Sequence, residues 1–220
     1  MSVAPLDLRI QRGLEAQVRA LHECTAAGER RIGWKIALND PRVQEALEIS
    51  LPMIGHLVSG REVSAGGSHS LAGATQPAIE PEIAVHVGEG GTIAGLGPAL
   101  EVIDVDMPFD DLERLLAANV FHRAVVLGPV TEGIASLDGL NARFLRDGEQ
   151  QSAIDVAAAA MGPGGVVALV AGYLEAVGES LQAGDVIIAG SLVTALPATA
   201  GRFELQVDML GSVAVELTSA

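Results

Sequence analysis

Hydrophobic residues in the first fifty positions follow a helical period. Leucine, isoleucine and valine recur every three or four positions from Leu6 to Leu21, which predicts an amphipathic helix ending near Gly28. A short strand is expected over 31–38, and Asp40-Pro41 supplies a cap and a first-turn proline for a helix through about Glu48. Residues 5–50 are therefore predicted to form a mostly helical segment that packs on the rest of the chain.

From residue 51 onward the period changes to two, which is typical of strands. Residues 79–87 alternate strictly, with Ile79 and Ile83 on one face and Glu80 and Glu82 on the other. Asp147-Gly148 is a strong two-residue hairpin signal. Other strands are expected at 55–63, 99–105, 125–128, 186–189, 203–207 and 212–217, helices at 110–118 (capped by Asp110) and 163–177, and loops at 64–74 and 88–97. The pattern predicts one mixed α+β domain over 1–220, with a β-rich core at about 51–220.

Composition changes this picture by excluding classes of partner. The 220 residues are 49% hydrophobic and 3% aromatic, so the core must be large and aliphatic. A net charge of −15 argues against nucleic-acid and membrane-surface partners. The apolar stretch 153–174 is interrupted by Gly162-Pro163, which argues against a membrane span, and the N-terminus lacks signal-peptide features. The single cysteine, Cys24, fits a reduced, cytoplasmic setting.

Three carboxylates stand out as candidate chemistry. Glu80 and Glu82 leave the same strand face about 6.6 Å apart, and a solvent-exposed face is the simplest explanation for that pair alone. Glu101 lies inside an apolar strand, where a lone carboxylate is unfavourable. Together the three would suit Mg²⁺ or Mn²⁺. Asp104 and Asp106 are further candidates, although Asp104 points to the opposite face from Glu101.

Lys35 is the other charge in an unexpected place, between Trp34 and Ile36 on a short apolar strand. A lone lysine in a strand is usually a surface residue whose stem lies along the apolar surface. Beside a metal and an anionic substrate it would instead anchor the substrate electrostatically or carry a proton.

Six segments follow one another along the chain in a recognisable order. They are 33–38 (GWKIAL), 52–57 (PMIGHL), 79–84 (IEPEIA), 98–104 (PALEVID), 183–192 (AGDVIIAGSL) and 210–215 (LGSVAV). In this order they resemble the fumarylacetoacetate hydrolase superfamily, and within it the branch of 2-keto-4-pentenoate hydratases and 4-oxalocrotonate decarboxylases. The resemblance runs from about residue 33 to residue 217. Any one matching segment is weak evidence, but six in the same order are strong.

The resemblance implies a fold, a site and a reaction. The fold would be a mixed β-sheet roll or barrel with peripheral helices. The site would hold Mg²⁺ or Mn²⁺, beside a small 2-oxo acid with a 4,5 double bond, and the activity would be a hydratase, a lyase. A homo-oligomer, and association with a decarboxylase or hydratase partner, would also be expected. The implied site residues are Glu80, Glu82 and Glu101 for the metal, Lys35 and His56 for catalysis, and Ser191, Leu192 and Asn119 for substrate binding.

Departures from the family pattern keep alternatives open. The family's acidic residue after the second segment falls at Ser59 or Gly60, a threonine is replaced by Val193, and of an Asp-Asn-Ala-Ser stretch only Asn119 remains. The connection from Glu82 to Glu101 is also shorter than usual. Decarboxylase, acylpyruvate-type hydrolase and non-catalytic partner subunit therefore remain alternatives. Of the other histidines, His86 is expected to lie too far from the metal, and His22, His69 and His122 are expected at the surface.

Overall fold

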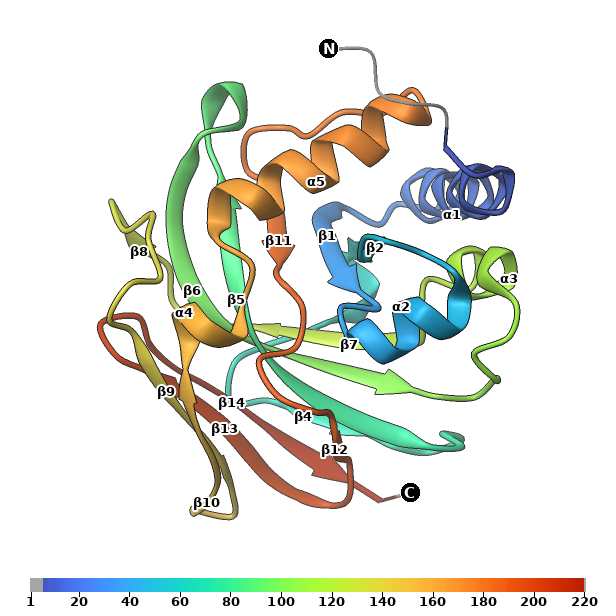
Figure 1. The fold of residues 1–220 in the computed structure, drawn as a ribbon. Helices are drawn as coiled ribbons and strands as arrows, with labels where there is room; N and C mark the ends of the chain where they lie inside the picture. Colours follow the sequence, from blue (N-terminus) through green and yellow to red (C-terminus); the bar gives the residue numbers. More distant parts are fainter. Residues whose placement is uncertain (1–5, 220) are drawn as a thin grey trace.

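The computed structural model describes residues 6–219, which fold into two β-sheets with helices around one of them (Figure 1). The helices are α1 (Leu8–Ala26), α2 (Pro41–Leu47), α3 (Leu112–Ala117), α4 (Val156–Ala159) and α5 (Pro163–Ala176), with short 3-10 turns at Ser59–Arg61 and Glu89–Gly91. What was expected of residues 1–5 lies outside the described residues.

The larger sheet has nine strands and forms the centre of the molecule. Its main order is β2-β1-β11-β5-β6-β7-β3, with β12 beside β5 and β8 beside β6. The pairing is mixed, because β1 runs parallel to β11 whereas β5 and β6 form a long antiparallel hairpin. The strands are β1 (Arg31–Ala37), β2 (Met53–Val58), β3 (Glu62–Val63), β5 (Pro77–Val87), β6 (Ile93–Asp104), β7 (His122–Leu127), β8 (Thr131–Glu132), β11 (Val186–Ile188) and β12 (Leu196–Pro197).

A five-stranded sheet of order β10-β9-β13-β14-β4 packs below the first and carries the C-terminal strands (Figure 1). Its strands are β4 (Ser68–Ser70), β9 (Asn141–Arg146), β10 (Glu149–Asp155), β13 (Gly201–Val207) and β14 (Gly211–Thr218). Phe144 and Phe203 pack in the core with ring centroids 6.1 Å apart, both fully buried. The α+β class, with a curled mixed sheet and peripheral helices, is confirmed.

The outer edge of β2 is covered by side chains from two other elements. Gln17 of α1 donates to Ile54 O of β2 (3.0 Å) and to Leu116 O of α3 (2.9 Å). Asn119, just before β7, accepts from His56 N at 2.8 Å and donates to His56 O at 2.9 Å. Three backbone groups of this edge strand, Ile54 O and His56 N and O, thus have partners, and Asn119 links β2 to the segment just before β7.

Most of the predicted elements are present. The boundaries that differ from prediction lie where contacts with distant parts of the chain determine the structure. The loop expected at 88–97 is too long, because β6 already begins at Ile93. Gly95 and Gly97 lie within that strand, where a Cβ would come within 2.6 Å of Thr131 O and 2.5 Å of Pro129 O. These glycines permit a close backbone approach and do not mark a turn.

Two further boundaries differ from the sequence-based expectation. Within the loop expected at 64–74, Ser68–Ser70 form the short strand β4, which pairs in parallel with β14. Helix α3 is capped by Asp111, whose carboxylate accepts from Arg114 N at 3.0 Å, and not by Asp110. Asp147-Gly148 does form the turn between β9 and β10, with both residues at positive φ (50° and 83°), as the hairpin signal predicts.

One segment of the described chain, Val156–Ala176, has the length and hydropathy of a membrane-spanning helix. The structure divides it into α4 and α5, because Ala160 and Gly162 adopt extended backbone angles. Val166, Val170 and Leu174 of α5 are fully buried in the core. The expected interruption at Gly162-Pro163 is therefore present, and the segment is not one continuous helix.

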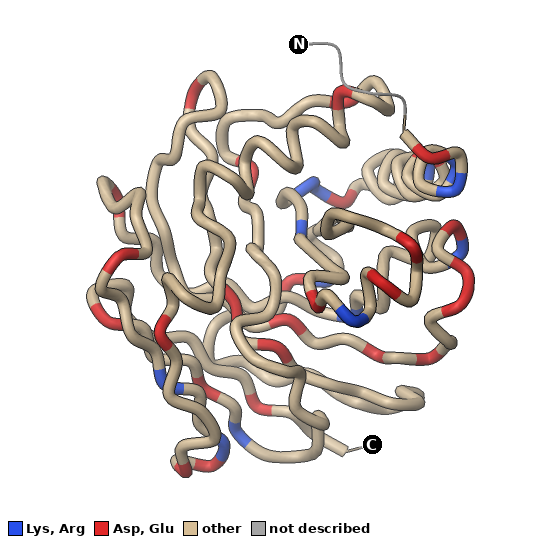
Figure 2. Tube along the Cα trace, viewed as in Figure 1, with Lys and Arg blue, Asp and Glu red and all other residues tan. Residues whose placement is uncertain are grey.

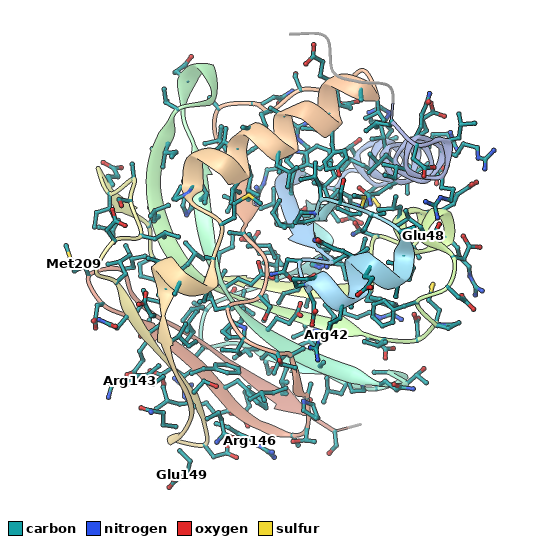
Figure 3. All side chains as sticks on the ribbon, viewed as in Figure 1. Arg42, Glu48, Arg143, Arg146, Glu149 and Met209 are labelled. Carbon is teal, nitrogen blue, oxygen red and sulfur yellow. The ribbon has the colours of Figure 1, made fainter. Side chains whose placement is uncertain are left out.

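Acidic residues are distributed over helix ends, turns and strands along the whole chain (Figure 2). Arginines such as Arg42, Arg143 and Arg146, and the exposed Met209, project outward from the ribbon (Figure 3). Most charged side chains are thus at the surface, whereas Lys35, Glu82 and Glu101 are buried in the larger sheet.

Candidate metal and substrate site

Three glutamates converge on one face of the β5–β6 hairpin. Glu80 of β5 is directly opposite Glu101 of β6 in the antiparallel register, and Glu82 follows two residues later on the same face. One carboxylate oxygen from each lies within 4.8 Å of the others. Strand alternation therefore brings together three carboxylates that sequence reasoning had grouped.

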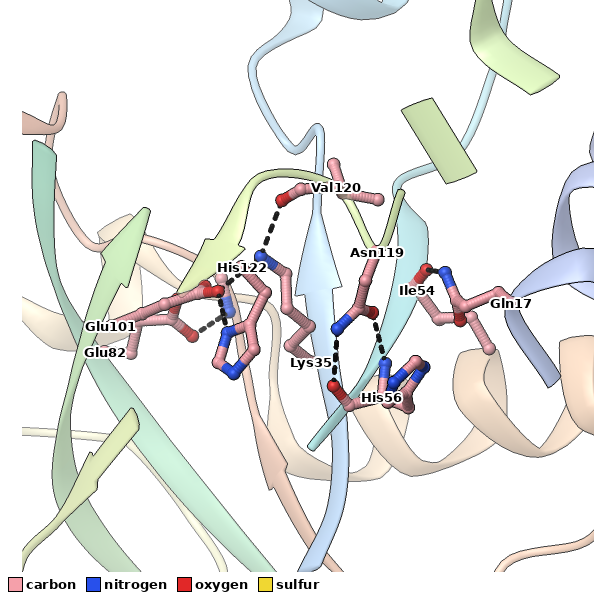
Figure 4. Close-up of polar contacts among 10 residues, drawn as sticks. Gln17, Lys35, Ile54, His56, Glu82, Glu101, Asn119, Val120 and His122 are labelled. Atoms are coloured by element: carbon pink, nitrogen blue, oxygen red, sulfur yellow. Dashed lines mark hydrogen bonds and ion pairs between the residues drawn. The ribbon is translucent and has the colours of Figure 1, made fainter. Parts of the chain in front are cut away.

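The glutamates are not on a solvent-exposed face, because Glu82 and Glu101 are both 0% exposed. Glu82 Oε2 accepts a hydrogen bond from Gly190 N at 2.7 Å (Figure 4). Glu82 Oε1 and Glu101 Oε2, however, have no hydrogen-bond partner within residues 6–219. Buried carboxylate oxygens without partners are strongly unfavourable, so this donor set fits a bound divalent cation.

The three carboxylates titrate differently. Burial, reinforced by the nearby Glu101 charge, raises the pKa of Glu80 to about 7. Burial and the neighbouring carboxylates raise the pKa of Glu82 well above its usual range. Burial would also raise the pKa of Glu101, but Lys35 and His122 outweigh it, and the net shift is downward. Glu101 therefore favours its ionised form, whereas a cation would have to displace protons from Glu80 and Glu82 in order to bind.

Lys35 is the only lysine in the chain and is 2% exposed, so it is not a surface residue. Its ammonium group forms an ion pair with Glu101 and donates to Val120 O at 3.0 Å (Figure 4). Gly55, its partner on β2, leaves room for its stem, because a Cβ there would lie 2.8 Å from Lys35 Cγ. The local sequence is thus built to bury this one ammonium beside the glutamates.

His122 belongs to the same cluster, although sequence reasoning expected it at the surface. Its side chain is buried, and Nδ1 donates to Glu101 Oε1 at 2.7 Å, the oxygen that Lys35 also holds. The strand expected at 125–128 in fact begins at His122, where it pairs with β6 close to Glu101. If this strand had been predicted to begin three residues earlier, His122 would have been placed inside the sheet.

An unusual backbone segment places Val120 O against Lys35. Asn119, Val120 and Phe121 have φ values of 58°, 44° and 65°, all in the left-handed region. For the β-branched Val120 this is strained, and strain of this kind concentrates at functional sites. The Asn119 amide is engaged with the His56 backbone and does not line the pocket next to Lys35.

His56 itself lies on the opposite face of the sheet from Lys35, because it pairs with Trp34 in the β1–β2 register. Burial lowers its pKa to about 4, with the nearby His122 and Lys35 adding to the effect. The His56 ring therefore points to the face opposite Lys35, and His56 is tied to the segment before β7 by its backbone hydrogen bonds to Asn119.

A pocket of about 130 Å³ opens beside the cluster. Lys35, Glu80 and Ser191 form its polar end, and Val43, Phe109 and Phe121 are among its apolar walls. Ser191 Oγ donates to Val193 O at 2.6 Å. Leu192 does not line the pocket. It is buried in the core, and its N–H donates to Pro81 O at 2.9 Å.

The remaining acidic and histidine candidates lie elsewhere. Asp104 accepts from Thr75 N and Gln76 N and pairs with Arg123, which also pairs with Asp106, so both aspartates stabilise a turn. The side chain of His22 is 61% exposed, and His69 is half-buried, lining a different pocket. Neither these residues nor His86 belongs to the carboxylate cluster.

A curled mixed sheet that carries three convergent glutamates and a buried lysine defines the class of this site as a candidate divalent-cation site. No family model matches the chain. A 2-hydroxyhexa-2,4-dienoate hydratase from Comamonas testosteroni is 30% identical, with 99% of this chain and 91% of that protein covered. A 2-keto-4-pentenoate hydratase from Burkholderia vietnamiensis is 32% identical, with 87% and 79% covered.

Among solved structures, a 4-oxalocrotonate decarboxylase from Pseudomonas putida G7, complexed with magnesium and adipate, superimposes with a TM-score of 0.80. It is 24% identical, with 92% of this chain and 83% of that chain covered. A fumarylpyruvate hydrolase from Pseudomonas aeruginosa, complexed with Mn²⁺ and pyruvate, has a TM-score of 0.65 at 14% identity, with 87% and 90% covered. The chain belongs to the hydratase and decarboxylase branch of the fumarylacetoacetate hydrolase superfamily.

Proposed function

We propose that the protein is a divalent-metal-dependent hydratase that adds water to a 2-hydroxydienoate, the enol form of a 2-oxo-4-enoate. The observation that carries this proposal is the pair of buried, partnerless oxygens on Glu82 and Glu101, next to a pocket that Lys35 and Glu80 line. The names of the hydratase relatives support the reaction class.

The proposed cofactor is Mg²⁺ or Mn²⁺, held by Glu80, Glu82 and Glu101. These three residues offer only oxygen atoms, which suits hard divalent ions and would suit zinc poorly. Neighbouring structures that contain magnesium, calcium or Mn²⁺ agree with this choice. A cation held by these three glutamates would supply electrostatic stabilisation of enolate charge on the substrate.

The chain's own groups would perform the proton transfers. Lys35 lines the pocket and its ammonium group contacts Glu101, so it is proposed to pass a proton to and from the substrate as the dienol becomes a ketone conjugated with a C3–C4 double bond. C4 of that ketone is electrophilic, and water adds its oxygen there while C3 gains a proton. Glu101 and Val120 O hold the ammonium in place, and the apolar walls limit competing solvent.

Ser191, Leu192, Asn119 and His56 are proposed in supporting roles. Ser191 lines the pocket, which supports the proposal that it contacts the substrate. For the other three, the contacts favour a role in holding the walls and strands that carry the site. Assembly as a homo-oligomer, alone or with a partner enzyme, and a cytoplasmic location are also proposed, and light scattering and cell fractionation test them.

The test is turnover of 2-hydroxypenta-2,4-dienoate, followed as loss of dienol absorbance, with Mg²⁺ or Mn²⁺ and then with EDTA. Metal-dependent loss of the dienol with formation of the hydrated 2-oxo acid supports the proposal. A decarboxylase relative from a Pseudomonas species is 28% identical, with 87% of this chain covered, so carbon dioxide release from 4-oxalocrotonate is measured in parallel. Release of carbon dioxide without hydration overturns the hydratase proposal, and so does the absence of any turnover.

A further inference from the structure

A second pocket, of about 220 Å³, lies at the end of β6 and takes no part in the reaction proposed above. Ile103 lines both this pocket and the pocket beside Lys35, and it is the one residue they share. Val102 and Asp104 also line the second pocket, and strand alternation places them on the face of β6 opposite Glu101. The other walls come from the 3-10 turn after β2, from β4 with the loop that follows it, and from β7.

Two arginines line this second pocket, and only one of them is neutralised. Arg123 pairs with Asp104 at 3.2 Å and with Asp106 at 2.6 Å. Arg61, at the end of the 3-10 turn, forms no ion pair within residues 6–219. In a protein with a net charge of −15, an arginine that lines a pocket without a carboxylate partner is a cation that an anionic ligand can use.

Asp104, the carboxylate among the described lining residues, is already satisfied within the fold. Its Oδ1 accepts from Thr75 N at 3.0 Å and from Gln76 N at 2.7 Å. Its Oδ2 accepts from Thr75 N at 3.0 Å and from Arg123 at 3.2 Å. The charge of Asp104 is therefore balanced by these donors, and it neither holds Arg61 nor leaves an uncompensated anion to repel a ligand.

Two neutral groups lie in the same pocket as Arg61 and can donate hydrogen bonds. Burial lowers the pKa of His69, and the charge of Arg61 lowers it further, so its imidazole is neutral near pH 7 and carries one N–H. Ser70 Oγ accepts from Ala72 N at 3.2 Å, which leaves its O–H to donate. A cation with two neutral donors beside it is a donor set that suits an oxyanion.

The loop that forms one wall of this pocket is small and anchored at both ends. Residues 72–74 are Ala-Gly-Ala, so their side chains occupy little of the space. Before them, Leu71 N donates to Thr218 O at 2.9 Å, and after them Thr75 N is held by Asp104. Because the wall is fixed before a ligand arrives, binding costs little ordering of this loop.

We propose that this second pocket binds a small oxyanion, a phosphate or a carboxylate group, at a site separate from the three glutamates. The Arg61 guanidinium pairs with the oxyanion, and His69 and Ser70 donate hydrogen bonds to it. The proposal does not depend on the hydratase reaction.

The probes are inorganic phosphate and acetate, each titrated into metal-free protein and followed by isothermal titration calorimetry in a Tris buffer of low ionic strength. The metal is removed with a chelating resin, because EDTA is itself a carboxylate. We expect at least one of the two anions to bind saturably at one site per chain. Binding of phosphate alone would assign the site to phosphate compounds, and binding of acetate would assign it to carboxylates. Binding of neither anion at millimolar concentration would overturn the proposal.

Variants of Arg61 test whether the bound anion uses this cation. Arg61→Gln should weaken binding at least about 10-fold, because a charged partner is lost. The matched control is Arg19→Gln, which removes the same charge from an exposed position on α1 outside the pocket and should bind as the wild type does. Melting temperatures of both variants verify that they fold. Equal weakening in the two variants, or unchanged binding in Arg61→Gln, would overturn the proposal.

A pair of serine variants separates this pocket from the one beside Lys35. Ser70→Ala should weaken binding of the anion about 3-fold, whereas Ser191→Ala, the same change in the other pocket, should leave it unchanged. Weakening by Ser191→Ala and not by Ser70→Ala would place the anion in the proposed substrate pocket and reject the second site.

The anion site and the proposed hydratase can fail separately. Hydration of the dienoate by a protein that binds neither anion would keep the hydratase and reject the anion site. Arg61-dependent binding of an anion without turnover of any dienoate would keep the anion site and reject the hydratase.

Discussion

At the scale of single residues, the site depends on carboxylate oxygens that the fold itself leaves unpaired. Glu82 is the clearest case, since Gly190 N satisfies one of its oxygens and nothing in residues 6–219 satisfies the other. We expect Glu82→Gln to weaken Mn²⁺ binding at least about 100-fold, because a charged ligand is lost while the shape is kept. Calorimetry and Mn²⁺ relaxation measure this.

The fold of that variant should not suffer. At pH 8, removing a buried carboxylate whose pKa is raised should leave the metal-free melting temperature equal or higher. Glu89→Gln, on the exposed turn between β5 and β6, is the matched control and should bind Mn²⁺ as the wild type does. Unchanged Mn²⁺ affinity in Glu82→Gln would remove Glu82 from the site.

His122 provides a second prediction at this scale. It holds Glu101 Oε1, which leaves Oε2 as the free ligand atom, so it positions Glu101 without touching the cation. Groups that orient a metal ligand typically contribute about 10- to 100-fold in affinity. We expect His122→Leu to weaken Mn²⁺ binding by that amount and His122→Asn, whose amide can still donate, to retain most of it. Equal losses in both variants would indicate a packing role only.

Sequence reasoning identified some of these residues and not others, for physical reasons. Glu101 and Lys35 were found because a charge within an apolar strand needs a partner, and that rule is local. His122 was missed because its meaning depends on which residue lies across the sheet, and register is set by the whole fold. The hydrogen bonds of Asn119 to the His56 backbone could not be predicted for the same reason, since the two residues are 63 positions apart.

At the scale of elements, the edge of β2 is maintained by side chains and not by another strand. We expect Asn119→Ala to destabilise the protein by about 2 kcal/mol, because two backbone groups of His56 lose their partners and asparagine tolerates positive φ better than alanine does. Urea unfolding measures this. Asn141→Ala, at an exposed site with only marginal side-chain contacts, is the control and should change stability little. If Asn119→Ala lowered the affinity for substrate without lowering the stability of the protein, Asn119 would be a substrate-binding residue.

The elements themselves were predictable where local pattern decides them. The period of α1, the cap of α2 and the Asp147-Gly148 turn all followed from local sequence. The glycine-rich start of β6 was assigned to a loop because glycine usually marks turns, whereas here it permits close approach of neighbouring backbone. The curl of the sheet, which brings β2 to Asn119, had no local signal at all.

At the scale of the whole molecule, the buried glutamates belong to a protein that carries a net charge of −15. Without a metal ion, Glu80 has a folded-state pKa of about 7 against an ordinary value of 4.5. A carboxyl group with a raised pKa binds more protons in the folded state, so its contribution is fully present below about pH 4.5 and is lost as pH rises through about 7. The metal-free protein should therefore lose stability between pH 5.5 and pH 8.

The size of that loss can be bounded and tested against a variant. The full shift corresponds to about 3 kcal/mol, of which about 2 kcal/mol lies between pH 5.5 and pH 8, and this is a fall of about 4 to 8 °C in melting temperature for a chain of this size. Glu80→Gln should melt as the wild type does near pH 5 and above it at pH 8, both in EDTA. The difference between the two proteins isolates Glu80 from the other titrating groups. A wild type that is as stable as Glu80→Gln at pH 8 would contradict the raised pKa.

A bound metal ion should reverse the pH dependence of the protein's stability, because a divalent cation must displace the protons on Glu80 and Glu82 before it binds. Added Mn²⁺ should raise the wild-type melting temperature strongly at pH 8, weakly at pH 5.5, and far less in Glu80→Gln at either pH, as differential scanning fluorimetry would measure. Glu89→Gln should follow the wild type throughout. Stabilisation by Mn²⁺ that is equal at pH 5.5 and pH 8 would mean that the cation binds elsewhere on this acidic surface. In that case the three glutamates would have to be neutralised by protons and Lys35 alone.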